Sequence, residues 1–222
     1  MQEPREVRER GKAMLYDFFE MHLTKGDVAL GKEWPEADSE RKAVDTVVIH
    51  HTGSPPGMGR MRLSAIELIR LYAPYFIDPK SKRDLHLKGQ PVASGHFCEG
   101  KQVFWPYHWI VRSNGRAERL LLDNEIGWHA GDWDVNCRSV AITLDNDYEN
   151  QRPSTTELNG IAEIINDHYG QASLKNVVGH REVNARTSCP SNLFLTGSIN
   201  RGWKDEILHV LKRKTLAFGS AA

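Results

Sequence analysis

The apolar residues of this chain gather in short runs separated by polar turns, which predicts strands that alternate with helices. One run rich in β-branched residues ends in His50 and is typical of a buried strand. The pair Asn114-Gly115 lies between two further runs and predicts a β-hairpin. The predicted strands cover residues 46–50, 107–112, 117–122, 139–144 and 176–179.

Helical spacing of apolar residues predicts helices in four other segments. Two of them begin with a capping box, in which a serine and a glutamate three residues later bond each other's backbone N–H groups. The capping boxes are Ser64 with Glu67 and Ser154 with Glu157. The predicted helices cover residues 4–23, a segment that starts at Ser64 and is limited by Pro74, residues 154–169 before Gly170, and residues 203–213.

Alternating strands and helices with one antiparallel hairpin predict an α/β fold, in which helices flank a central mixed sheet. The predicted helix at residues 4–23 would be an extra N-terminal element. With 222 residues, the chain is long enough to bury one substantial core. We expect an N-terminal helix and connecting loop at 1–43, a main domain at 44–214 with a loop insertion at 78–104, and a tail at 215–222.

Charge and cysteine content exclude several classes of protein. Lys plus Arg and Asp plus Glu number 29 each, so no overall field attracts nucleic acid. The 3 cysteines are irregularly spaced, which argues against a disulfide framework and suits a reducing compartment. No signal peptide and no membrane-spanning run is recognisable, so we expect a cytoplasmic protein. We also expect it to be a monomer.

His50, His180 and Cys189 form a candidate zinc site, although they are far apart in the sequence. Two imidazoles and a thiolate would leave the fourth tetrahedral position open, as in catalytic rather than structural zinc sites. Each residue also has a plainer interpretation. His50 could be a hydrogen-bonded core histidine, His180 a turn residue, and Cys189 a small buried apolar residue.

Four segments together resemble the zinc-dependent N-acetylmuramoyl-L-alanine amidases, a family that includes phage amidase-type lysozymes and peptidoglycan recognition proteins. They are VVIHHTG, YHWIVRSNG, GWHAGDWDVNCRSVAITL and GHREVNARTSCP. The resemblance extends from about residue 44 to 212. It implies a groove for peptidoglycan fragments (muropeptides) above a single Zn²⁺, held by His50, His180 and Cys189.

The resemblance also implies roles for other residues. Tyr107 matches the catalytic tyrosine, whose phenol can hydrogen-bond a developing oxyanion. Thr187 stands where phage members have lysine and many recognition-protein amidases have threonine, so it could donate a hydrogen bond but supply no cation. The predicted substrate-binding residues are His51, His129 and Asn136, although a supporting role is open for each.

Glu182 resembles the family's acidic position, but its spacing does not fit a His-Glu-x-x-His helix, so we expect a structural ion pair or cap. Three tryptophans near the predicted groove could stack on sugar faces or pack in the core. They are Trp105, Trp128 and Trp133.

The function that the resemblance implies is hydrolysis of the amide bond between N-acetylmuramic acid and L-alanine. Two alternatives stay open: a non-catalytic peptidoglycan-binding module and a zinc hydrolase of another amide. Loss of the cysteine ligand marks the non-catalytic recognition proteins, and this chain keeps Cys189. Release to the cell wall by lysis, or origin from a truncated exported precursor, also stays open.

Overall fold

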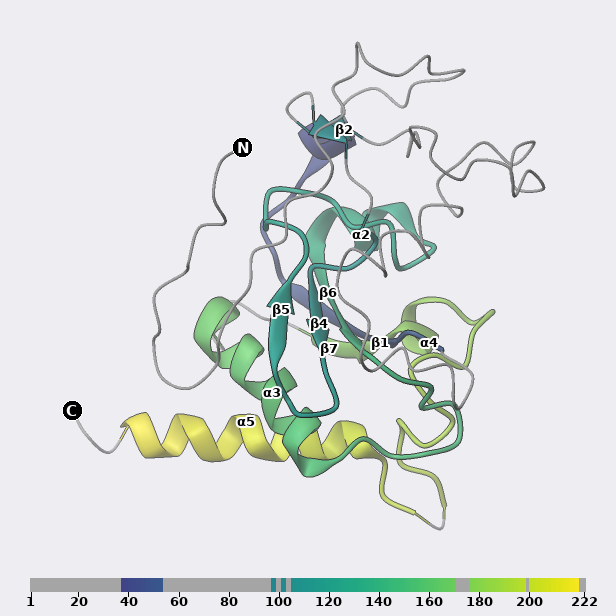
Figure 1. Ribbon diagram of the computed structural model, residues 1–222, viewed down its shortest axis with the longest axis vertical. Coiled ribbons are helices and arrows are strands. Elements are labelled where there is room, and N and C mark those ends of the chain that lie inside the picture. Colours follow the sequence, from purple (N-terminus) through teal and green to yellow (C-terminus); the bar gives the residue numbers. More distant parts are fainter. Residues whose placement is uncertain are drawn as a thin grey trace.

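The computed structural model shows an α/β fold built on one five-stranded sheet (Figure 1). The predicted helices at residues 4–23 and at Ser64 lie outside the described residues, as does most of the insertion at 78–104. Within that insertion the structure describes a two-stranded antiparallel ribbon, β2 (Phe97–Cys98) with β3 (Lys101–Gln102). The structure describes residues 37–53, 97–98, 101–102, 105–170, 176–198 and 200–219.

The sheet has the order β5-β4-β6-β1-β7 and is mixed. Strands β4, β6, β1 and β7 are mutually parallel, whereas β5 runs antiparallel to β4. This arrangement confirms the predicted mixed sheet and hairpin. The strands are β1 (Thr46–His51), β4 (Trp109–Val111), β5 (Ala117–Arg119), β6 (Ser139–Leu144) and β7 (Asn176–Gly179).

Helices cover both faces of the sheet, and they include short ones that were not predicted. The capping box of Ser154 and Glu157 is confirmed at the start of α3, and the following π-helical turn η4 ends at Gly170. The short helices α2 and α4 were missed, and α5 runs further than residue 213. The helical segments are η1 (Ala37–Glu40), α2 (Trp133–Arg138), α3 (Thr155–Ile164), η4 (Ile165–Tyr169), α4 (His180–Val183) and α5 (Trp203–Gly219).

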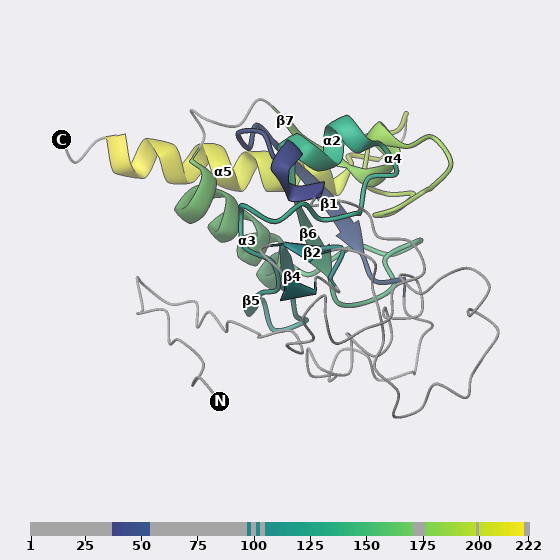
Figure 2. The ribbon, with the colours of Figure 1, turned by 90° about the horizontal axis from the view of Figure 1, so that it is seen from above.

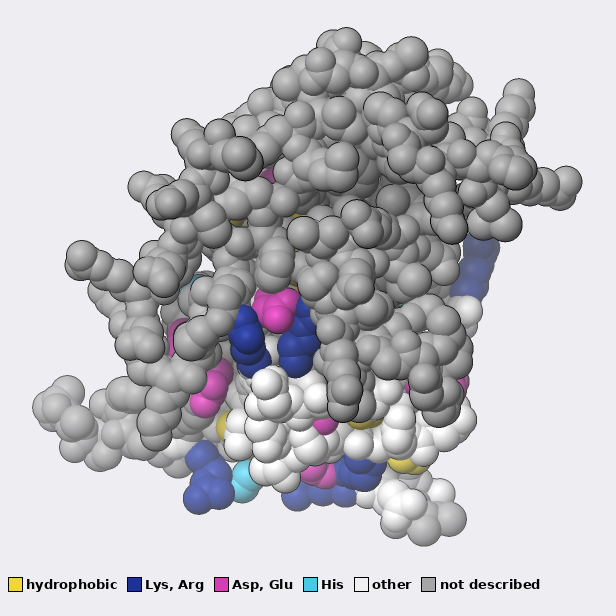
Figure 3. All heavy atoms as spheres, viewed as in Figure 1, with side chains coloured by type: hydrophobic (Ala, Val, Ile, Leu, Met, Phe, Trp, Pro, Cys, Tyr) yellow, Lys and Arg dark blue, Asp and Glu magenta, His cyan; other side chains and the backbone are white. Residues whose placement is uncertain are grey.

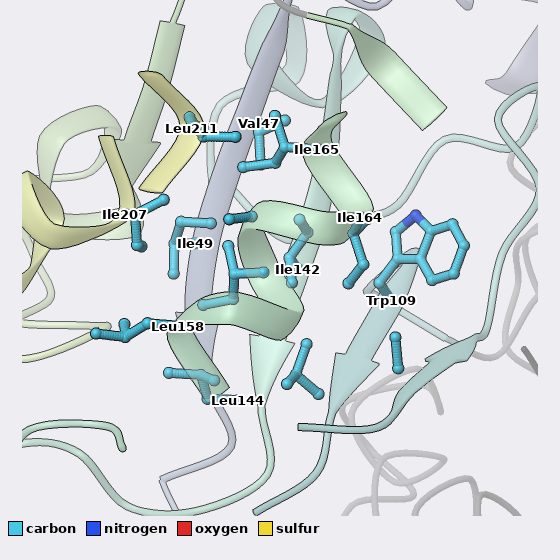
Figure 4. Packing of buried hydrophobic residues seen from close by; sticks show 14 of the residues in the cluster. Val47, Ile49, Trp109, Ile142, Leu144, Leu158, Ile164, Ile165, Ile207 and Leu211 are labelled. Atoms are coloured by element: carbon cyan, nitrogen blue, oxygen red, sulfur yellow. The ribbon is translucent and has the colours of Figure 1, made fainter. Parts of the chain in front are cut away.

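One face of the sheet packs against α3 and α5, which lie side by side in Figures 1 and 2. Alternate residues of a strand point to opposite faces, and the odd-numbered Val47 and Ile49 of β1 point to this one. They pack with apolar residues of both helices, as Figure 4 shows. The residues labelled there are Val47, Ile49, Trp109, Ile142, Leu144, Leu158, Ile164, Ile165, Ile207 and Leu211.

The opposite face carries the polar side chains from which the candidate site is built. Val48 of β1 packs there against Ala130 and Val135. By the same alternation, His50 of β1 points to this face, beside Thr143 of β6 in the parallel register. The sheet therefore separates an apolar face from a face that carries histidines.

The surface of the described part of the chain is mixed in charge. On the face shown in Figure 3, its acidic and basic side chains lie interspersed. Among the described residues, the helices are too short or too polar to cross a membrane.

Candidate metal centre

The register of the sheet brings His50 and His180 together at the carboxyl ends of two parallel strands. Ile49 of β1 pairs with Gly179 of β7, so the next residue of each segment is a histidine. The two imidazole rings lie 4.6 Å apart between centroids, at 51° to each other. The strand predicted at residues 176–179 thus presents His180 beside His50.

Cys189 reaches the same point from the loop that follows α4. Its carbonyl oxygen accepts a hydrogen bond of 2.7 Å from the Arg181 backbone N–H, which ties the loop to the helix. The Cys189 Sγ lies 3.7 Å from His50 Nδ1. One ligand atom from each of His50, His180 and Cys189 lies within 4.8 Å of the other two.

This set of donors fits a zinc ion. A tetrahedral zinc with Zn–N of about 2.05 Å and Zn–S of about 2.3 Å separates nitrogen from sulfur by about 3.6 Å. The observed separation of 3.7 Å between Cys189 Sγ and His50 Nδ1 is close to that value. The His180 Nε2 lies 3.2 Å from the Ala130 carbonyl oxygen, which can only accept, so the proton is on Nε2 and Nδ1 has the free lone pair.

Burial favours uncharged forms of these ligands. It lowers the pKa of His50 well below that of a free histidine, and the neighbouring His129 lowers it further. It also lowers the pKa of His180. Burial raises the pKa of the Cys189 thiol to about 12. Both imidazoles are therefore ready to coordinate at neutral pH, whereas the thiol gives up its proton only to a strong positive charge such as a metal ion.

His51, the last residue of β1, contacts the polar segment 147–149 and is not one of the three clustered donors. Its Nδ1 accepts a hydrogen bond of 2.9 Å from the Tyr148 backbone N–H. The carboxylates of Asp147 and Glu149 lie 3.6 and 4.0 Å from its ring nitrogens. These two acidic residues were not predicted as part of the site, because the polar segment after residue 144 indicated only a loop. A substrate-binding role for His51 stays a prediction.

Tyr107 and Thr187 each lie close to one of the three ligands. The Tyr107 ring is partly exposed, and its centroid lies 5.0 Å from that of His50. The Thr187 hydroxyl oxygen accepts a hydrogen bond of 3.1 Å from the Cys189 backbone N–H. The hydroxyl proton of Thr187 is not used in that bond, so it can be donated elsewhere.

His129 and Asn136 are buried beneath His50, each only 6% exposed. His129 Nδ1 lies 3.1 Å from His50 Nε2. The Asn136 Oδ1 accepts from the backbone N–H groups of His129 and Ala130, at 3.2 and 2.8 Å. Burial lowers the pKa of His129 to about 3, so its ring is neutral. Substrate binding by either residue stays a prediction, but these contacts favour a supporting role.

Glu182 has the structural role that the sequence predicted. Its Oε2 accepts a hydrogen bond of 2.7 Å from the Gly179 backbone N–H at the start of α4. Its Oε1 lies 2.7 Å from Lys204 Nζ on α5. The carboxylate therefore caps the helix that begins with His180 and links that helix to α5.

The three tryptophans predicted near the groove differ in burial. Trp105 is 1% exposed and belongs to the core. Trp128 and Trp133 are partly buried and form an edge-to-face pair with centroids 6.4 Å apart. Trp133 Nε1 also donates to Glu40, which joins α2 to η1.

Comparisons with known proteins identify solved structures of similar fold and one protein family. The structure of an N-acetylmuramoyl-L-alanine amidase, LysC from Clostridium intestinale, is similar with a TM-score of 0.50 and 17% identity, over 83% of this chain and 95% of that one. Drosophila PGRP-LB gives a TM-score of 0.45 and 20% identity, over 68% of this chain and 76% of that one. Among curated protein sequences, none matches this chain. The family model described as N-acetylmuramoyl-L-alanine amidase matches residues 40–192, so the chain belongs to this family.

Proposed function

We propose that this protein hydrolyses the amide bond between N-acetylmuramic acid and L-alanine of peptidoglycan stem peptides, with one zinc ion held by His50, His180 and Cys189. The observation that carries the proposal is the convergence of these three donors within 4.8 Å, in a chain of the amidase family. Two imidazoles and a thiolate leave one position for a reactant, as catalytic zinc sites do.

The chemistry that a bound zinc ion supplies is Lewis acidity, which polarises a carbonyl and lowers the pKa of water to about 7. The protein's own side chains would act on the charge that develops on the carbonyl oxygen. Tyr107, which is partly exposed beside His50, would donate a hydrogen bond from its phenol. Thr187 would donate from its hydroxyl.

The leaving amine needs a proton before the stem peptide can depart. We assign its transfer to Tyr107, whose phenol would donate a proton to the amine nitrogen as the C–N bond breaks and would recover one from the attacking water. Tyr107 would thus contribute to both halves of the reaction, first as a donor to the oxyanion and then as a relay to the amine.

Mass spectrometry of a purified muropeptide tests the proposal. The protein is incubated with the muropeptide alone, with a chelator, and with a chelator followed by excess zinc. We expect release of a stem peptide with a free N-terminal alanine, which chelation abolishes and zinc restores. An intact muropeptide in a zinc-loaded sample would overturn the proposal. Measured binding would then favour the non-catalytic module, and cleavage of small acyl-peptides would favour another amide substrate.

A further inference from the structure

A chain of three hydrogen bonds runs from the metal centre to the end of a helix. His50 Nε2 lies 3.1 Å from His129 Nδ1, and His129 Nε2 lies 3.2 Å from Ser139 Oγ. Ser139 Oγ lies 2.6 Å from the Val135 carbonyl oxygen in α2. The three side chains are buried, with exposures of 1% for His50, 6% for His129 and 0% for Ser139.

The Val135 carbonyl, the last group in this series of hydrogen bonds, fixes the donor and acceptor of each hydrogen bond before it. The Val135 carbonyl oxygen can only accept, so the Ser139 hydroxyl uses its single proton there. Ser139 Oγ must then accept from His129 Nε2, which places the proton of the neutral His129 ring on Nε2. His129 Nδ1 is left as an acceptor.

The direction of these hydrogen bonds decides which ring nitrogen of His50 keeps a lone pair for a metal ion. Since His129 Nδ1 accepts, His50 must donate from Nε2, and its Nδ1 keeps the lone pair. Nδ1 is the nitrogen that faces Cys189 Sγ, at 3.7 Å. With the opposite direction, the proton of His50 would point at the metal position and block coordination.

Secondary structure holds Ser139 and the Val135 carbonyl, the two groups at the far end of this series of hydrogen bonds. Ser139 is the residue after α2 and the first of β6, where it pairs with Thr46 of β1. Other carbonyls at the end of α2 are also satisfied, since Arg41 Nη1 donates to those of Asn136 and Cys137 at 3.0 and 3.3 Å. The Val135 carbonyl is thus held by α2, and the Ser139 residue that donates to it is held by the sheet.

We propose that His129 and Ser139 are positioning residues of the metal centre, which hold His50 as the tautomer that offers Nδ1 to the metal. The inference rests on the proposed function, because it takes His50 as a ligand. Metal-binding histidines generally donate their second ring N–H to a carbonyl or carboxylate. Here His129 and Ser139 lie between His50 and the backbone carbonyl at the end of the series, that of Val135 in α2.

Two measurements on the full chain test this role apart from catalysis. Long-range ¹⁵N–¹H NMR of the metal-free protein reports which ring nitrogen of each histidine carries the proton, and we expect Nε2–H for both His50 and His129. Competition with a chromogenic chelator gives the zinc affinity. We expect Ser139→Ala to weaken zinc binding about 10-fold and His129→Leu between about 10-fold and 100-fold. His129→Asn should restore part of the loss, because its amide oxygen can accept from His50.

Thr143→Val is the matched control. Thr143 lies on the same face of β6 as Ser139 and beside His50 in the register, and its buried hydroxyl has no hydrogen-bond partner in the described part of the chain. This variant should keep the zinc affinity of the parent protein. Ser139→Ala removes only one oxygen, so it serves as the test if His129→Leu does not fold.

The outcomes separate this inference from the proposed function. A parent protein that binds zinc, with Ser139→Ala equally tight and with His50 protonated on Nδ1 in the metal-free form, would overturn the positioning role alone. A parent protein that binds no zinc would overturn both. Zinc binding that weakens as expected in a protein that leaves muropeptide intact would support the positioning role and reject the amidase.

Discussion

The carboxylate of Glu182 lies 2.7 Å from the ammonium group of Lys204, and this pair fastens α4 to α5. Because Glu182 also caps the helix that begins with His180, it acts on the metal centre only through the backbone. We expect Glu182→Gln to keep the cap through its amide oxygen and to lose the ion pair. Stability should fall by about 1 kcal/mol or less, with turnover within about twofold of the parent. A turnover loss above about 100-fold at full zinc occupancy would instead identify Glu182 as a catalytic acid or base.

Tyr107→Phe tests the donor beside His50. The change removes one hydroxyl and keeps the ring that packs 5.0 Å from the imidazole of His50. Loss of one donor to an oxyanion typically costs about 100-fold to 1,000-fold in turnover, so kcat on muropeptide should fall by that order. Zinc content, measured by mass spectrometry of the metal, should stay the same. Unchanged kcat would remove Tyr107 from the mechanism.

Cys189→Ala tests the proposed thiolate ligand. The thiolate would be one of the protein's three ligands to zinc, so zinc affinity should fall by more than the 100-fold or so that marks the loss of a supporting residue. Binding of muropeptide, measured by calorimetry, should persist. Cleavage by a zinc-free Cys189→Ala protein at the parent rate would show that the site is not catalytic.

Arg112 lies in a buried ion triad whose disruption should be costly. Its guanidinium contacts Glu118 Oε2 at 2.7 Å and Asp145 Oδ2 at 2.6 Å. Arg112→Leu would leave two carboxylates buried without their cation, so urea unfolding should show a loss of about 3 to 5 kcal/mol. Arg201→Ala is the control, because the exposed Arg201–Asp205 pair, at 3.7 Å, should contribute less than about 1 kcal/mol.

The stability of the metal-free protein should fall as the pH drops below 6.5. Burial lowers the pKa of His108 well below that of a free histidine, which is about 6.5, and Arg41 and Arg119 lower it further. Below pH 6.5 the unfolded chain therefore binds a proton that the folded chain excludes, so stability is complete above that pH and declines below it. Each such histidine contributes a slope of up to about 1.4 kcal/mol per pH unit.

His108→Gln isolates the contribution of this one histidine. His108 Nε2 lies 3.0 Å from the Glu125 carbonyl oxygen, a bond that a glutamine amide can also donate. Urea unfolding of both proteins between pH 7.5 and 5 should give a shallower decline for His108→Gln. Equal slopes would contradict the assignment of a neutral, buried His108.

Much of the fold follows from short-range patterns, and what was missed depends on distant contacts. The run that ends at His50, the Asn114-Gly115 turn and the capping box of Ser154 each predict an element that the structure contains. Helix α2 was missed because it has only 6 residues, and Arg41, far away in sequence, donates to its last carbonyls. A six-residue segment has too little periodicity to predict a helix.

The candidate site shows the same division. His50, His180 and Cys189 were identified through their segments, and the structure brings them together. The contact of His129 with Ser139 was not predicted, because it needs the loop that follows β5 to fold back over the start of β6. No local pattern reports which of two buried polar side chains will meet in this way.

Because the parallel register aligns Ile49 with Gly179, a metal ion bound by His50 and His180 would have a part in folding. A slip of one residue in either direction would turn His50 toward α3 and α5 and put Ile49 or His51 in its place. A metal ion that needs His50 and His180 on the same face would bind only the chain with the correct register. The free energy of zinc binding would then favour the sheet with the native register over sheets in which β1 is shifted by one residue.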